Sequence, residues 1–232
     1  MQTGWGLGIP NVMGVLKALF LLWAAVEASP DFGTDYSPSH PLAVAAAAGN
    51  CSELLLLLQK GRTQIDTPSA FGMTALHLAA AGDHVDAISL LLEHGASTEL
   101  PTERGMEVPG QPGQLWTPLF TAAYRGHTNA VRALLDGGAQ VDAEDAGEST
   151  PLMIAANVGR EPVVAQLLVQ RAGFQRQNKF GISPLMFASD KGHAAIAKRL
   201  VEAGASVEQR DKEGWTALMF ASFSGQTACR PI

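Results

Sequence analysis

Four hydroxyl residues recur at a fixed interval of 33 residues along this chain: Thr117, Thr150, Ser183 and Thr216. A fixed period of this size is the sequence signature of a repeat protein, in which one structural unit is copied and stacked on its neighbour. The period therefore predicts an elongated stack of equivalent units. A length of 232 residues with 47% apolar residues suits one such stack with a continuous core.

Each unit carries the signals for two helices. Thr117 is a good N-cap, because its hydroxyl accepts a hydrogen bond from a backbone N–H of the first turn, and Pro118 fits the first helical position. Gly126 can adopt the left-handed conformation that ends this helix. The second helix has apolar residues at i, i+3 and i+4 spacing, which form one stripe: Val131, Leu134 and Leu135. One unit cannot bury that stripe alone, so the units must stack.

Two units depart from the glycine pattern. Asp83 stands at the position of Gly126 in another unit, and aspartate tolerates the left-handed conformation better than most residues. Arg171 takes the position of Gly138 at the end of a second helix, and we expect this replacement to cost some stability.

The segment Thr74-Ala75-Leu76-His77-Leu78-Ala79-Ala80 resembles the Thr-Pro-Leu-His-x-Ala core of the ankyrin repeat, whose unit is about 33 residues long. The resemblance implies an all-α ankyrin-repeat solenoid of stacked helix-turn-helix units with β-turn or hairpin loops. It covers residues 39–225 as about five full repeats and a partial sixth, between an N-terminal segment and linker at 1–38 and a tail at 226–232.

The resemblance also implies a role for His77, since the family's histidine joins adjacent loops by hydrogen bonds. Other residues replace it in the remaining units, so we expect this stack to depend more on apolar packing: Ala43, Phe120, Met153, Met186 and Met219. The three methionines occupy one inward position in successive units, and we interpret them as core residues rather than a cofactor site.

Charge and cysteine usage narrow the classes of partner. The formal charge of −6 and the absence of a basic run argue against nucleic acid, because phosphate binding needs clustered Lys and Arg. Cys51 and Cys229 lie five repeats apart, too far to form a disulfide within one stack, so they give no sign of an oxidising compartment.

The N-terminal segment has two interpretations. Lys17 precedes an apolar run at residues 18–26, and Val26-x-Ala28 can serve as a signal-peptide cleavage site. The run is too short to cross a membrane as a helix. Alternatively, apolar residues recur here at helical spacing and can form a cap over the first repeat. We expect a cytoplasmic protein if the segment is a cap, and the secretory pathway if residues 1–28 are a signal.

Two further segments interrupt the pattern. The interval from Thr74 to Thr117 is ten residues longer than the period, and the Pro- and Gly-rich residues 99–114 predict an outward loop. In the sixth unit the second helix is missing, which would leave Leu218, Met219 and Phe220 uncovered. A homotypic contact, a truncated or alternatively spliced product, and a mistaken gene end each explain this last feature.

No catalytic motif is recognisable, and no cofactor or metal site is predicted. His84, His127 and His193 each follow a helix turn in a different unit, so they are spaced too widely to bind one metal ion and are interpreted as structural residues.

The prediction is a non-enzymatic scaffold or adaptor that binds another protein through a concave groove and the 99–114 loop. The residues expected in the groove include types that are enriched at interfaces. By repeat register they are Phe71, Met73, Trp116, Tyr124, Arg125, Asn157, Lys179, Phe180, Ile182, Asp190, Lys191, Lys212, Trp215 and Phe223. The alternatives are a secreted or membrane-associated ankyrin protein, and the regulatory or targeting portion of a larger enzyme.

Overall fold

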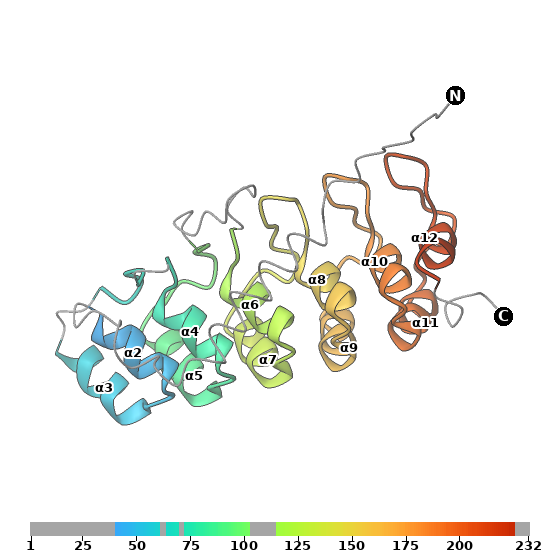
Figure 1. Ribbon diagram of the computed structural model, residues 1–232. Helices are drawn as coiled ribbons and strands as arrows, with labels where there is room; N and C mark the ends of the chain where they lie inside the picture. The colour runs from blue at the N-terminus through green and yellow to red at the C-terminus, as the bar shows by residue number, and fades with distance from the viewer. Residues whose placement is uncertain (1–39, 61–63, 70–71, 103–114, 226–232) are drawn as a thin grey trace.

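The computed structural model describes residues 40–60, 64–69, 72–102 and 115–225 (Figure 1). Within these ranges the chain forms eleven α-helices and no strand, which confirms the predicted all-α repeat solenoid. The helices are α2 (Pro41–Ala47), α3 (Cys51–Gln59), α4 (Ala75–Ala81), α5 (Val85–Glu93), α6 (Pro118–Arg125), α7 (Thr128–Asp136), α8 (Pro151–Val158), α9 (Glu161–Val169), α10 (Pro184–Lys191), α11 (Ala194–Glu202) and α12 (Ala217–Phe223).

The helices are arranged in two parallel rows. The first helices of the units, α2, α4, α6, α8, α10 and α12, each contact the next member of their row. The second helices, from α3 to α11, form the other row in the same way. Figure 1 shows that the loops leading into α8, α10 and α12 project from the same side of this double row.

The predicted helix starts are confirmed. In each case the side chain of the N-cap residue accepts a hydrogen bond from the backbone N–H three residues later: Thr74, Thr117, Thr150, Ser183 and Thr216. The predicted glycine ends are also present, since Gly126, Gly159 and Gly192 follow α6, α8 and α10 in the left-handed conformation.

Both replacements of glycine occur at left-handed positions. Asp83 has φ of 55° and Arg171 has φ of 63°. The Asp83 side chain has a role that glycine lacks, because its Oδ1 accepts a hydrogen bond of 2.9 Å from the backbone N–H of Ala130 at the start of α7. The replacement at Asp83 therefore joins two neighbouring units.

One continuous apolar core extends through the described units from Leu42 to Ala217. Alanine pairs in the first helices, such as Ala122 and Ala123, are fully buried and let adjacent helices approach closely. Phe120, Met153 and Met186 are buried as predicted, with exposed fractions of 1%, 0% and 0%.

The prediction of a core position was wrong for Met219, which is 46% exposed. The reason is its place on α12, the last described helix, where no further unit among the described residues covers this side. Leu218 is 44% exposed for the same reason, so Leu218 and Met219 agree with the uncovered apolar face expected there. That expectation was wrong for Phe220, which is half-buried and packs against the core.

Several predictions concern residues outside the described ranges. They are the cap or signal at 1–38, the loop residues 103–114, Phe71, Cys229 and the tail at 226–232. No helix in the part of the chain that the structure describes is long and apolar enough to cross a membrane.

Candidate functional site

The tips of the projecting loops are fixed by side chains that recur with the repeat period. Asp145, Asn178 and Asp211 lie 33 residues apart, and each Oδ1 accepts two backbone hydrogen bonds from its own loop. In the middle loop the donors are Phe180 and Ile182, both at 3.0 Å. Each loop is thus closed into a tight hairpin-like turn.

Two opposing effects act on the pKa of the Asp145 carboxyl group at such a turn. Burial raises the pKa of the Asp145 carboxyl group, while the N–H groups of Ser149 and Gly147 act in the opposite direction. The loop-closing residues were missed by the sequence analysis. Their 33-residue spacing, in register with the N-caps, is the signal that identifies them.

Adjacent loop tips are joined to each other. The backbone N–H of Lys179 donates to the carbonyl of Gly147 at 3.0 Å, and the N–H of Lys212 donates to the carbonyl of Phe180 at 3.2 Å. The Gln177 side chain adds a bond of 2.7 Å to the carbonyl of Arg210. These bonds hold the tips side by side, so the residues that they carry keep fixed relative positions.

The turns between first and second helices are also joined by hydrogen bonds from one unit to the next. The Nε2 atoms of His84, His127 and His193 lie 3.0–3.2 Å from carbonyl oxygens of the preceding unit, at Ala47, Ala81 and Asn157. A carbonyl can only accept, so each ring nitrogen donates. Arg160 occupies the same position in its unit, and its Nε donates to the carbonyl of Tyr124 at 3.1 Å. The structural role predicted for the three histidines is present.

His77 links two loops, as the resemblance implied. Its Nδ1 lies 2.8 Å from Thr74 Oγ1, and its Nε2 donates to the carbonyl of Trp116 at 2.8 Å. Burial lowers the pKa of His77 to about 4, against a smaller raising effect from the Trp116 carbonyl. The imidazole is therefore neutral at pH 7.

An aromatic cluster lies beside the bond between His77 and Trp116, and it is formed by Trp116 and two residues of α6. The ring of Trp116 is 5.2 Å from Phe120 and 5.1 Å from Tyr124, centroid to centroid. Trp116 also pairs with Thr102 through two hydrogen bonds, which close the base of the predicted 99–114 loop. Phe120 is buried, whereas Tyr124 is half-buried, so part of the tyrosine side chain remains accessible to solvent. Burial raises the pKa of Tyr124.

A second aromatic cluster lies at α12. Trp215 packs against Phe220 at 5.5 Å and against Phe223 at 5.4 Å, with the Phe223 ring nearly perpendicular. Phe223 is 67% exposed. Nearby, Asp190 forms an ion pair of 2.7 Å with Lys191 and accepts a hydrogen bond from Ser224, which ties α10 to the end of α12.

The remaining predicted residues differ in how much surface they offer. Phe180 is 42% exposed at a loop tip, with the Lys179 ammonium group 5.3 Å from its ring centroid, and Lys212 is exposed at the next tip. Met73, Arg125 and Ile182 are half-buried. Asn157 is buried, and among the described residues its Oδ1 has no hydrogen-bond partner.

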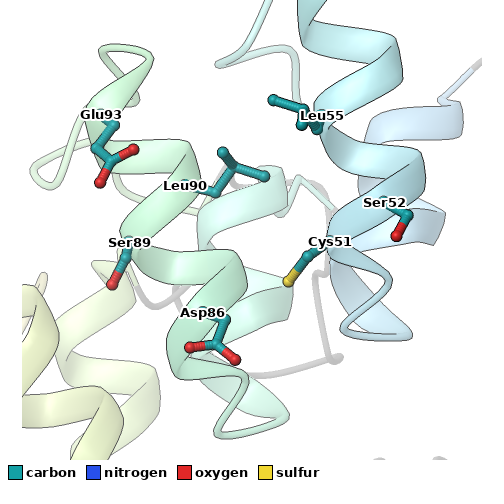
Figure 2. Close-up of a pocket in the computed structure, with 7 residues that line it drawn as sticks. All are labelled: Cys51, Ser52, Leu55, Asp86, Ser89, Leu90 and Glu93. Atoms are coloured by element: carbon teal, nitrogen blue, oxygen red, sulfur yellow. The ribbon is translucent and has the colours of Figure 1, made fainter.

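A separate hollow of about 370 Å³ lies between the second helices α3 and α5 (Figure 2). It is lined by Cys51, Ser52, Leu55, Asp86, Ser89, Leu90 and Glu93. Among the residues that the structure describes, no group of three or more His, Cys, Asp or Glu could hold a metal ion. The hollow belongs to the second-helix row and not to the loop tips.

Two rows of helices with joined loop tips define a helical-repeat solenoid that presents a rigid surface. The family is shown by comparison, since a family model described as Ankyrin repeats (3 copies) matches residues 14–102, 42–145, 103–175 and 152–231. The chain therefore belongs to the ankyrin repeat family. Ankyrin repeats generally mediate interactions between proteins and are typically non-enzymatic.

Several larger proteins contain a similar segment. The human SH3 and multiple ankyrin repeat domains protein 1 is 33% identical over 117 residues, which are 50% of this chain and 5% of that protein. The human SH3 and multiple ankyrin repeat domains protein 2 is 32% identical over 117 residues, covering 6% of its length. Glycerophosphocholine phosphodiesterase GDE1 of Candida albicans is 39% identical over 72 residues, covering 31% of this chain and 5% of that protein. The chain thus spans about one twentieth of these relatives.

Proposed function

We propose that this chain is a non-enzymatic scaffold or adaptor that binds another protein through its loop tips and the adjoining sides of the first helices. The observation that carries the proposal is the bonding between adjacent tips through Lys179 and Lys212. Because the tips are already ordered, the repeat protein loses little conformational freedom when a partner binds them.

The side chains on this surface support the same proposal. Phe180 and Phe223 expose apolar rings, Tyr124 exposes part of its ring, and Lys179 and Lys212 supply charge at the rim. Aromatic anchors surrounded by polar groups are typical of the residues that dominate binding energy at interfaces. Trp116 has a second role inside the protein, since it packs on Phe120 and accepts the bond from His77, so it is a poor choice for testing binding alone.

The test compares two double variants of the full chain. Phe180→Ala with Tyr124→Ala removes the two anchors, and the matched control, Val169→Ala with Val201→Ala, removes exposed apolar side chains from the second-helix row. Partners are first recovered by covalent cross-linking in cells and identified by mass spectrometry, and the affinity of each is then measured with purified protein. We expect the anchor variant to lose at least about tenfold in affinity, and the control to bind normally.

The measured affinities decide which of the two surfaces binds the partner. Equal affinities for wild type and the anchor variant contradict the proposed surface. A loss of affinity confined to the control variant assigns binding to the second-helix row instead. Circular dichroism must show equal helicity in all three proteins for either conclusion.

The similarity to glycerophosphocholine phosphodiesterase GDE1 favours a second candidate, in which the repeats are the regulatory or targeting portion of a larger enzyme. The intact mass of the native protein tests this candidate. A mass above that of residues 1–232, with repeat sequence continuing past Gly225, supports it. The same measurement tests the proposed cytoplasmic location, because a secreted form lacks residues 1–28.

A further inference from the structure

The exposure of matched residues shows which side of a unit faces its predecessor. Val44 and Phe220 both lie four residues after an N-cap, yet Val44 is 40% exposed while Phe220 packs against the core. The pattern is reversed two residues after the cap, where Leu42 is 6% exposed and Leu218 is 44% exposed. The fourth position therefore faces the preceding unit, which α12 has and α2 lacks among the described residues.

The second helix of the first unit shows the same asymmetry. Leu90 of α5 lies on the side of α5 that faces α3, where it lines the hollow together with Leu55 (Figure 2). By repeat register the residue of α3 that matches Leu90 is Leu56, since each is six residues after its N-cap, Asn50 or His84. Leu56 is 53% exposed, whereas Leu90 is half-buried against the core. Val44 and Leu56 thus form an apolar end face on the first unit.

The sequence that precedes α2 has the composition and the register to cover this end face. Helix α3 is Cys51–Gln59, and one period of 33 residues earlier lies the apolar run at 18–26, which has the same length. The family model also begins its first match at residue 14, ahead of the first described helix. Both observations favour a degenerate repeat before α2.

We propose that residues 18–26 form a helix that packs on the end face of the first unit, next to α3, as α3 packs next to α5. Its apolar side chains, including Leu19, Leu22 and Trp23, cover Val44 and Leu56. The 13 residues 27–39 are long enough for the connection, because an extended chain of that length spans about 40 Å and packed helices lie about 8–10 Å apart. The cap removes apolar surface from water at the end of the solenoid, where no neighbouring unit does so.

The test uses the full chain and the variant Leu56→Asp. Because Leu56 is exposed in the described stack, aspartate at this position is tolerated if nothing covers it. If the helix packs there, the change buries a charge and displaces the helix. We expect the amides of residues 18–26 to be protected from hydrogen exchange by at least about tenfold in the wild type, and to lose that protection in Leu56→Asp. The Tm of the variant should fall by several degrees.

The variants Trp23→Asp and Val169→Asp complete the experiment. Trp23→Asp should have the same effect as Leu56→Asp, and combining the two should add little, because both break one contact. Val169 is 76% exposed on α9, so Val169→Asp should leave the exchange at residues 18–26 unchanged. Unprotected amides at 18–26 in the wild type overturn the proposal. So does a native protein that begins after Ala28, or a Leu56→Asp variant whose only change is the loss of a dimer in light scattering.

Discussion

The burial of His77 makes the stability of the fold depend on pH. Its pKa is about 4 in the folded chain and 6.5 in an unfolded one. Between these values the unfolded chain binds a proton at His77 that the folded chain does not. The free energy of unfolding therefore decreases as the pH falls through this window, by about 2 kcal/mol between pH 7.5 and pH 5.

Urea unfolding of the wild type and of His77→Gln at these two pH values measures this contribution. The variant is less stable at both, because the bond to Trp116 is altered, but it should lose about 2 kcal/mol less than the wild type on acidification. Other acidic groups titrate in both proteins and cancel in the comparison. Identical losses would show that His77 is protonated with a normal pKa.

Three described residues other than glycine have a left-handed backbone, Asp83, Glu148 and Arg171. Asp83 and Arg171, which take the place of a glycine, should respond in opposite ways to replacement by glycine. Arg171 is exposed with φ of 63°, and relief of that backbone conformation should stabilise Arg171→Gly by about 0.5–1 kcal/mol. Asp83→Gly loses the bond to the Ala130 N–H and should be destabilised by about 1 kcal/mol. Thermal unfolding of both variants checks this pair, and a destabilised Arg171→Gly would mean that the arginine side chain has a stabilising role.

At the scale of the elements, the loop tips depend on one side-chain oxygen each. Asn178 is buried, and Asn178→Ala leaves the N–H groups of Phe180 and Ile182 without their acceptor. We expect a loss of about 1–2 kcal/mol and faster hydrogen exchange at those two amides. Asn178→Asp keeps the acceptor, as Asp145 and Asp211 do at matching positions, and should retain slow exchange. Fast exchange in both variants would assign the protection to the rest of the loop.

The helices themselves could be predicted from local signals. The N-cap residues, the glycine ends and the apolar spacing each act within one turn, so Thr117, Gly126 and Val131 are sufficient to position a helix pair. The bonds between units could not be predicted in the same way. Arg160 stands where other units have a histidine, and its side chain donates to the backbone carbonyl of Tyr124. This bond depends on the distance between two units, which no single repeat encodes.

At the scale of the whole molecule, the limits of the binding-surface prediction have a physical cause. Repeat register correctly identifies which residues lie on corresponding positions, but not how far each neighbour covers them. Asn157 and Phe180 were both predicted to face the groove, and the first is buried while the second is 42% exposed. Met219 shows the complementary error, because a core position requires a following unit and α12 has none among the described residues. Which of the predicted residues bind a partner stays a prediction.

The exposed face of α12 gives a last prediction about the molecule as a whole. Leu218, Met219 and Phe223 are 44%, 46% and 67% exposed and form one apolar face at the last described helix. We expect this face to mediate weak association between copies of the chain, since covering it removes apolar surface from water. Sedimentation velocity should show the average mass rising with concentration in the wild type and staying monomeric in Leu218→Lys with Met219→Lys.

The unfolding free energy of that variant should change little, because both side chains are already exposed. Val169→Lys, at a more exposed position on α9, is the control and should associate like the wild type. If the wild type is monomeric at all concentrations, copies of the chain do not associate through α12. The α12 face is then available to bind another protein. If Val169→Lys also abolishes association, added positive charge rather than the α12 face controls it, because the chain carries a net charge of −6 that a lysine reduces.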